Sequence, residues 1–267
     1  MPDTALPAPL VDWTGYEAVL FDLDGVLTAT ARLHAAAWTR LFDDYLARRA
    51  AARGEPFHRF EPRDYAQFVD GRPRYDGVRA FLASRGITVP DGTPDDPPGR
   101  ATVCGLGNRK QALFHETLTS EGVDTIPGTV AVVRHLQRHG VRRAVVSSSR
   151  NCAAILDAAG LAGFFELQVD GVVAERQGLP GKPAPDTFLH AARALGVAPS
   201  RAVVVEDAIA GVAAGRAGGF ALVVGIDRTG APGDLARAGA DLVVTDLADT
   251  LPAGAGPVAA TGAEEGG

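Results

Sequence analysis

Short apolar runs recur along the chain, and each is followed by charged, hydroxyl-bearing or glycine residues. A short uninterrupted apolar run predicts a strand that is buried on both faces, as in a parallel sheet. From the second run onward, helical patterns that end at a glycine lie between the runs, which predicts βαβ units. The predicted strands are 18–21, 143–148, 202–207, 221–226 and 241–245, and the predicted helices between them include 128–140, 151–160 and 184–196.

The segment 31–120 has a different pattern, with several helical periodicities and no comparable apolar run. A helical insertion after the first strand begins at the carboxyl end of the sheet, where parallel sheets place their ligands, so it predicts a lid. We therefore predict an α/β fold in which a Rossmann-like parallel-sheet core (15–30 and 121–252) carries an inserted all-helical cap domain (31–120). Residues 1–14 are expected to form a flexible lead-in, and residues 253–267 a disordered tail.

Composition and charge narrow the functional classes. The net charge is −6, which offers no basic surface for nucleic acid or an anionic membrane, and the N-terminus contains neither a signal peptide nor an apolar span. The two cysteines lack metal-site spacing, so a reducing compartment is expected. We predict a cytoplasmic protein without nucleic-acid or membrane partners, with a monomer as the default state.

The first predicted strand runs into Asp22 and Asp24, with Gly25 next. Side chains two residues apart in an extended segment project to one side, so both carboxylates can face one pocket. Paired carboxylates suit Mg²⁺, which prefers oxygen ligands. A solvated turn would explain this short motif equally well.

Three further strand ends or loops carry polar groups. Ser147 precedes a helix start that suits a phosphate or a simple N-cap, and Lys182 lies in a stiff Gly-Lys-Pro turn. Glu206 and Asp207 form a second acidic pair after an apolar strand. Each feature alone has an ordinary structural explanation, but their order along the chain predicts a phosphoryl-transfer site.

The stretches "FDLDGVLTATARLHAAAW", "VVSSSRN", "GKPAPDTFLHAARALGVAPS" and "VVVEDAIAGVAAGRAGGF" resemble the haloacid dehalogenase-like superfamily, and within it the β-phosphoglucomutase-like subfamily. The resemblance implies that Asp22 is a nucleophile that forms an aspartyl-phosphate, and that Asp24 is the general acid and base. It implies that Ser147 and Lys182 stabilise the transferred phosphoryl group. The implied Mg²⁺ ligands are Asp22, the main-chain carbonyl of Asp24, Glu206 and Asp207.

The resemblance also implies a set of substrate-binding residues on the cap and at the second strand end. These are Thr30, which also matches a lid hinge, together with His34, Trp38, Arg74, Ser149, Arg150 and Asn151. Packing would explain His34 and Trp38 as well. Asp70 stands where the subfamily has a lysine, and the loop 88–103 is longer than usual. Lys110 matches another lid cation, or an exposed helix face.

The expected activity is Mg²⁺-dependent phosphoryl transfer on a phosphorylated sugar, as in a β-phosphoglucomutase that interconverts β-glucose 1-phosphate and glucose 6-phosphate. A sugar-phosphate phosphatase with the same machinery is the alternative, motivated by Asp70. A remote third hypothesis is a non-enzymatic phospho-aspartate signalling module, but such modules lack an inserted lid.

Overall fold

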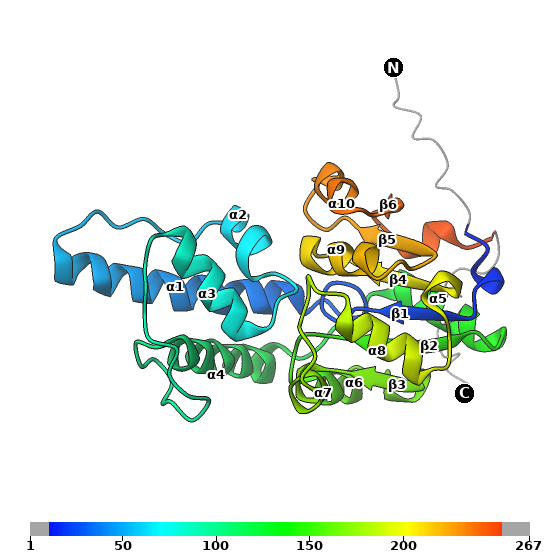
Figure 1. Ribbon diagram of the computed structural model, residues 1–267, viewed down its shortest axis with the longest axis horizontal. Coiled ribbons are helices and arrows are strands. Elements are labelled where there is room, and N and C mark those ends of the chain that lie inside the picture. Colours follow the sequence, from blue (N-terminus) through cyan, green and yellow to red (C-terminus); the bar gives the residue numbers. More distant parts are fainter. Residues whose placement is uncertain (1–10, 253–267) are drawn as a thin grey trace, which may run out of the picture.

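The computed structural model describes residues 11–252, so the predicted tail 253–267 and most of the predicted lead-in lie outside the described residues. Within the described part, a sheet-containing core lies beside a helical cap (Figure 1). No helix among residues 11–252 combines the length and the apolar character needed to cross a membrane.

All neighbouring strands of the core sheet pair in parallel, in the order β3-β2-β1-β4-β5-β6. This order reverses beside β1, so β1 and β4 flank the switch point at whose carboxyl side open sheets bind ligands. The predicted α/β class with a parallel sheet is confirmed. The strands are β1 (Ala18–Phe21), β2 (Arg142–Val146), β3 (Leu167–Val169), β4 (Ala202–Glu206), β5 (Leu222–Ile226) and β6 (Leu242–Val244).

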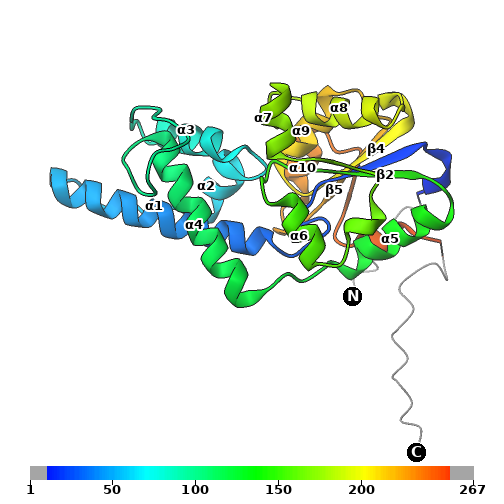
Figure 2. The same ribbon diagram turned by 90° about the horizontal axis from the view of Figure 1, so that it is seen from below.

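Helices cover both faces of the sheet (Figure 2). Alternate side chains of β1 point to opposite faces of the sheet. Leu20 lies in the same buried hydrophobic cluster as Phe188 of α8, whereas Phe21 lies in the same cluster as Ile155 of α6. The core is therefore two apolar layers separated by the sheet. One face carries α7 (Gly171–Gln177), α8 (Asp186–Ala194), α9 (Ile209–Ala217) and α10 (Pro232–Ala238), and the other carries α5 (Pro127–Arg138) and α6 (Cys152–Ala158).

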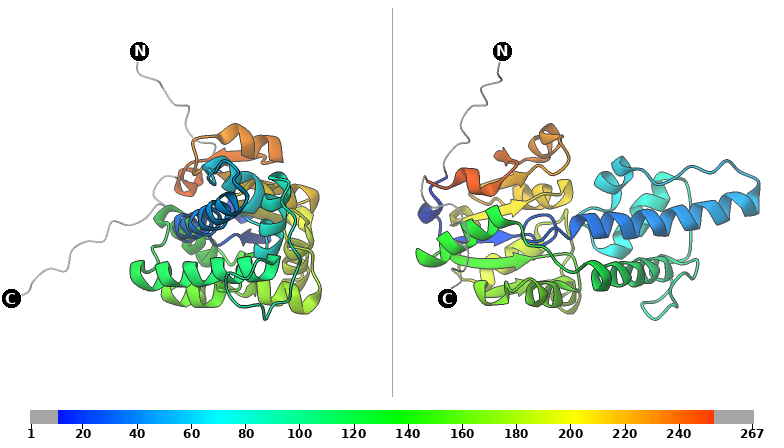
Figure 3. Two further views of the ribbon diagram at one scale, coloured as in Figure 1. Left: turned by 90° about the vertical axis from the view of Figure 1, so that its left-hand side faces the viewer. Right: turned by 180° about the vertical axis from the view of Figure 1, so that it is seen from behind.

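The cap is built on two long helices, α1 and α4, which run in roughly opposite directions and pack against each other at an angle (Figure 2). Seen from behind, α1 extends far beyond the sheet (Figure 3, right). Between these helices the chain forms a π-helical turn, Tyr65–Val69, and a long loop after α3. The cap helices are α1 (Ala31–Arg53), α2 (Pro62–Asp64), α3 (Arg74–Ser84) and α4 (Val103–Glu121). The exact division of the chain into core and cap stays a prediction.

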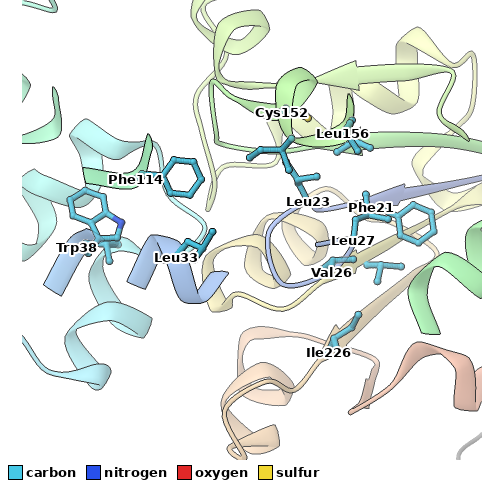
Figure 4. Close-up of a cluster of buried hydrophobic side chains, with 14 of the residues drawn as sticks. Phe21, Leu23, Val26, Leu27, Leu33, Trp38, Phe114, Cys152, Leu156 and Ile226 are labelled. Carbon is cyan, nitrogen blue, oxygen red and sulfur yellow. The ribbon is translucent and has the colours of Figure 1, made fainter. Parts of the chain in front are cut away.

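An apolar segment joins the two parts. Leu23, Val26 and Leu27, which follow β1, are 0% exposed and pack on core residues such as Leu156. The same cluster continues into the cap at Leu33 (Figure 4). Burying the segment on both sides of Asp24 fixes the direction in which that carboxylate leaves the chain.

One local prediction was wrong, and one strand was not predicted. Residues 11–14 are not a loose lead-in, because Trp13 is 1% exposed and its Nε1 donates to Oγ1 of Thr250 at 3.0 Å. The sequence analysis also missed β3, a three-residue edge strand in which Gln168 interrupts the apolar pattern.

Candidate active site

The predicted motif residues converge at the carboxyl ends of β1, β2 and β4, beneath the cap. A cavity of about 240 Å³ lies there, between core and cap. Its lining includes most of the predicted site residues: Asp22, Asp24, His34, Trp38, Arg74, Ser147, Ser149, Arg150 and Asp207. Residues that are far apart in sequence therefore share one cavity.

Lys182 lies at the base of this site, where it is 2% exposed. Its Nζ lies 2.5 Å from Oδ1 of Asp22 and 2.6 Å from Oε1 of Glu206, and it also donates to the carbonyl of Val146 at 2.8 Å. Burial alone would lower the pKa of Lys182, but the two carboxylates outweigh it and raise that pKa. The lysine is therefore a fixed positive charge beside Asp22.

Both carboxylate oxygens of Glu206 accept hydrogen bonds that fix the carboxylate beside Lys182. Its Oε2 accepts from the backbone N–H groups of Asp207 and Ala208, both at 3.1 Å, while Oε1 binds Lys182. A Cβ on Gly211 of α9 would lie 1.8 Å from Oε1, so the helix can pass this close only with glycine at that position.

Asp22, Glu206 and Asp207 bring carboxylate oxygens within 4.8 Å of one another. Burial raises the pKa of Asp22 and of Asp207 well above the ordinary value, and neighbouring carboxylates raise both further, although Lys182 opposes the shift at Asp22. Gly25 has φ 85° and a Cβ there would lie 1.7 Å from Oδ2 of Asp207, so this carboxylate occupies space that only glycine leaves open. The cluster has the oxygen donors and the excess negative charge that suit a divalent cation.

Asp24 turns away from this cluster toward the cap. Oγ1 of Thr30 donates to Oδ1 of Asp24 at 2.5 Å, and Nε2 of His34 lies 3.3 Å from the same oxygen. Although burial alone would raise the pKa of Asp24, His34 and Thr30 outweigh it and lower that pKa. Asp24 is therefore held as an ionised acceptor. Thr30, which we predicted as a substrate ligand, is 1% exposed and does not line the cavity, because its hydroxyl is used on Asp24.

Lys110 of α4, which the sequence analysis left open between a lid cation and an exposed helix face, continues this network. Its Nζ lies 2.5 Å from Nδ1 of His34, over the rings of Trp38 and Phe114. When Lys110 is charged its ammonium can only donate, so in that state Nδ1 accepts and the ring proton lies on Nε2, which faces Asp24. Burial lowers the pKa of Lys110 to about 7. Its sequence context resembles an exposed helix face, yet the side chain is 4% exposed.

The turn after β2 is stabilised by serine hydroxyls. Oγ of Ser147 accepts from the backbone N–H of Ser149 at 3.1 Å, and Oγ of Ser149 accepts from that of Asn151 at 3.2 Å. Asn151 does not line the cavity, and its Nδ2 is buried without a hydrogen-bond partner in the described part of the chain. Arg150 lines the cavity mouth and forms an ion pair with Glu175.

The cap segment 70–74 contributes residues that the motifs did not identify. The π-helical turn brings Asp70 back to Tyr65, because the amide of Asp70 donates to the carbonyl of Tyr65 at 3.0 Å and the phenol hydrogen-bonds the carboxylate. Burial raises the pKa of Asp70 to about 7. Arg72 lines the same cavity. A lone π-helical turn has no recognisable sequence signal.

Core and cap touch beside the cavity. Oγ of Ser148 donates to the carbonyl of Gly71 at 2.8 Å, and a Cβ on Gly181 would lie 2.2 Å from Cγ of Pro73. The cap segment therefore lies directly on the two core loops that carry Ser147 and Lys182, which limits the access of water to Asp22.

Comparison with known proteins agrees with this geometry. Residues 16–219 match the family model for haloacid dehalogenase-like hydrolases. A beta-phosphoglucomutase of Mycobacterium bovis is 53% identical over 88% of this chain and 91% of its own length, and hexitol phosphatase A of Escherichia coli is 31% identical over 85% and 90%. A crystal structure of beta-phosphoglucomutase from Clostridium difficile shares the fold, with a TM-score of 0.67 at 23% identity over 87% of this chain and 92% of that one. The chain belongs to the haloacid dehalogenase-like hydrolase family.

Proposed function

We propose that this enzyme is a β-phosphoglucomutase, which converts β-glucose 1-phosphate to glucose 6-phosphate through a bisphosphate. The 53% identity to a beta-phosphoglucomutase over most of both chains supports this activity. Membership in a hydrolase family argues against the non-enzymatic signalling alternative.

The observation that carries the proposal is the position of Asp24 between core and cap. A mutase needs a carboxylate that accepts a proton from one sugar hydroxyl and later returns a proton to another sugar oxygen. Thr30 donates to one oxygen of Asp24, and Nε2 of His34 lies 3.3 Å from the same oxygen. Because His34 belongs to the cap, the acid–base group is fully oriented only while the cap covers the site.

The residues present fit Mg²⁺. Asp22 and Asp207 offer carboxylate oxygens in a cluster with more negative charge than Lys182 alone balances, and Gly25 leaves room for Asp207. We propose that these two carboxylates, with Glu206 beside them and the main-chain carbonyl of Asp24, hold the cation. When bound, Mg²⁺ would lower the repulsion between the anionic nucleophile and the phosphate.

The chain's own groups then account for the chemistry. In the phosphorylated enzyme, the sugar O6 attacks the phosphorus on Asp22, the bond from phosphorus to the Asp22 oxygen breaks, and Asp24 takes the O6 proton. After the bisphosphate turns around, an Asp22 oxygen attacks the phosphorus at C1, the bond to O1 breaks, and Asp24 returns the proton to O1. Lys182 and Ser147 stabilise the charge on the phosphoryl oxygens in both steps.

The second phosphate needs cations on the far side of the cavity. We propose that Arg74 holds it from the cap, with Arg150, Ser149 and Asn151 on the core. A guanidinium binds a phosphate in bidentate fashion, which suits a group that is held and not transferred. Trp38 would shape the apolar wall.

A sugar-phosphate phosphatase is the second candidate. It is favoured by the 31% identity to hexitol phosphatase A and by Asp70, a carboxyl group that lines the cavity where the β-phosphoglucomutase-like subfamily has a lysine. The same Asp22 and Asp24 would then serve a water molecule as acceptor.

One assay separates the two activities. Purified enzyme is mixed with β-glucose 1-phosphate, Mg²⁺ and a trace of glucose 1,6-bisphosphate, and both glucose 6-phosphate and free phosphate are followed. The proposal requires glucose 6-phosphate without matching free phosphate. Free phosphate released at the rate of substrate loss would instead establish the phosphatase.

The state of the two cysteines bears on the compartment in which the enzyme works. Cys104 and Cys152 are both buried and unpaired, which agrees with a reducing compartment. We propose that the enzyme works in the cytoplasm as a monomer, on a phosphorylated sugar and without a nucleic-acid or membrane partner.

A further inference from the structure

We propose that Tyr75 and Asn108, anchored by the cap loop 90–102, are positioning residues that hold the guanidinium of Arg74 for the phosphate that is not being transferred. This inference rests on the proposed function, in which Arg74 binds that phosphate. It also gives the long cap loop a purpose that the sequence analysis did not supply.

A directed chain of hydrogen bonds links Arg74 to the loop. Nη2 of Arg74 donates to the hydroxyl of Tyr75 at 3.0 Å, and that hydroxyl donates to Oδ1 of Asn108 at 2.9 Å. Each group donates in the same direction along the chain, so the bonds polarise one another.

Asn108 is itself fixed by the loop. Its Nδ2 donates to the carbonyls of Pro94 at 2.9 Å and Asp96 at 2.8 Å. Both amide hydrogens of Asn108 are used on the loop, so its Oδ1 has one orientation, toward Tyr75. The loop backbone therefore decides where the phenol hydroxyl is held.

The loop is folded tightly onto the start of α4. Asp96, 7% exposed, accepts from the hydroxyl of Thr102 at 2.6 Å and pairs with Arg100 at 3.1 Å. A Cβ on Gly105 would lie 2.6 Å from the carbonyl oxygen of Arg100. The loop thus has a defined shape and can serve as a support.

The ring of Tyr75 fits against α4 through a second helical glycine. A Cβ on Gly107 would lie 2.6 Å from Cδ1 of Tyr75, and Cζ of Arg74 lies 4.8 Å from the centre of the same ring. Glycine destabilises a helix relative to alanine, so two glycines at 105 and 107 need a compensating reason. Close packing of the loop and of Tyr75 provides it.

The guanidinium of Arg74 is held in one orientation but still has hydrogen-bonding capacity for a ligand. Nε of Arg74 is buried and has no hydrogen-bond partner among residues 11–252. A buried donor of this kind is satisfied when an anion binds. Fixing a long side chain before the ligand arrives also removes part of the entropy cost of binding.

The test uses Tyr75→Phe, which keeps the ring and removes the hydroxyl. The control is Tyr45→Phe on α1, a half-buried cap tyrosine outside the cavity. If Arg74 holds its phosphate equally in the ground and transition states, Tyr75→Phe raises the KM for β-glucose 1-phosphate about 10-fold with kcat nearly unchanged. Phosphorylation of Asp22 by acetyl phosphate, which has no second phosphate, keeps its rate, and Tyr45→Phe behaves as wild type.

Two further variants separate positioning from general loosening of the cap. Asn108→Ala is expected to raise KM in the same way as Tyr75→Phe. In an Arg74→Ala background, Tyr75→Phe is expected to raise KM no further, because the group it positions is gone. An unchanged KM in Tyr75→Phe, or additive effects of the two changes, would overturn the inference while leaving the mutase proposal intact. A wild-type enzyme without isomerase activity would overturn both.

Discussion

The imidazole of His34 in the cap lies 3.3 Å from the carboxylate of Asp24 in the core. This contact joins the two parts of the molecule at the group that we propose moves the proton. Lys110 contacts the other ring nitrogen from the opposite side and, when charged, leaves the ring proton on the nitrogen that faces Asp24. Cap position and acid–base chemistry are therefore linked by one side chain.

Replacing His34 with alanine should remove this link. We expect His34→Ala to lower kcat about 100-fold, within the range typical of disturbed acid–base catalysis, because Asp24 loses its orientation. Steady-state isomerisation kinetics measure the effect. His115→Ala, which removes an exposed cap histidine, is the control and should retain activity. A wild-type rate in His34→Ala would contradict the role.

Lys182 should matter for stability as well as for activity. Lys182→Met leaves Asp22 and Glu206 buried together without their cation, so we expect a loss of about 3–5 kcal/mol in the free energy of unfolding. Urea unfolding measures this. Arg216→Met, which breaks a surface pair with Asp241, is the matched control and should cost less than about 1 kcal/mol. Equal losses in the free energy of unfolding would mean that the buried ion pairs of Lys182 stabilise the fold no more than a surface ion pair does.

Gly25 should be required for cation binding. In Gly25→Ala the new methyl group collides with Asp207, so we expect Mg²⁺ affinity, measured by calorimetry, to fall at least about 10-fold, the effect expected when a ligand is displaced. Gly86→Ala controls for backbone strain, because Gly86 also has positive φ but no atom within 4 Å of the added Cβ. Gly86→Ala should lose about 1–2 kcal/mol of stability through backbone strain and Gly25→Ala at least as much, but only Gly25→Ala should lose Mg²⁺ affinity. Full affinity in Gly25→Ala would argue against Asp207 as a ligand.

Asp70 predicts a pH effect on stability. Its pKa rises from 3.8 to about 7 in the folded protein, so between these values the folded state binds more protons than the unfolded state. Stability should therefore fall as the pH rises through this window, by no more than about 1.4 kcal/mol per unit for a single proton.

The corresponding experiment compares Asp70→Asn with wild type in urea unfolding in the presence of EDTA. The stability advantage of Asp70→Asn should grow from pH 5 to 7 and then level off. Asp157→Asn controls for the loss of an exposed carboxylate. A pH-independent difference between Asp70→Asn and wild type would show that Asp70 titrates normally.

The residues at the base of the site could be predicted from the sequence, because the carboxyl ends of parallel strands all lie at the same edge of the sheet. Asp22 and Glu206 come at the ends of apolar runs that are typical of buried strands, and the pairing of β1 with β4 brings them together. The predicted residues on the cap are less constrained. A helical pattern identifies an apolar face, but not which polar residue of α4 reaches the core, so the sequence could not decide between the two alternatives for Lys110.

Features that depend on the local backbone conformation could not be predicted from the sequence either. The π-helical turn that joins Tyr65 to Asp70 has no composition signal, and β3 is too short and too polar to be recognised. The glycines that end helices, by contrast, could be predicted from the sequence. Gly140, Gly160 and Gly196 all adopt the left-handed conformation that ends a helix, as the pattern indicated.

The most direct test of the mutase proposal is the fate of the phosphoryl group on Asp22. The enzyme is phosphorylated with labelled acetyl phosphate, separated from the reagent and mixed with β-glucose 1-phosphate in a rapid-quench apparatus. We predict that most of the label appears in the sugar bisphosphate, and that Asp24→Asn slows this transfer. Label released as inorganic phosphate at the same rate with and without the sugar would contradict the account.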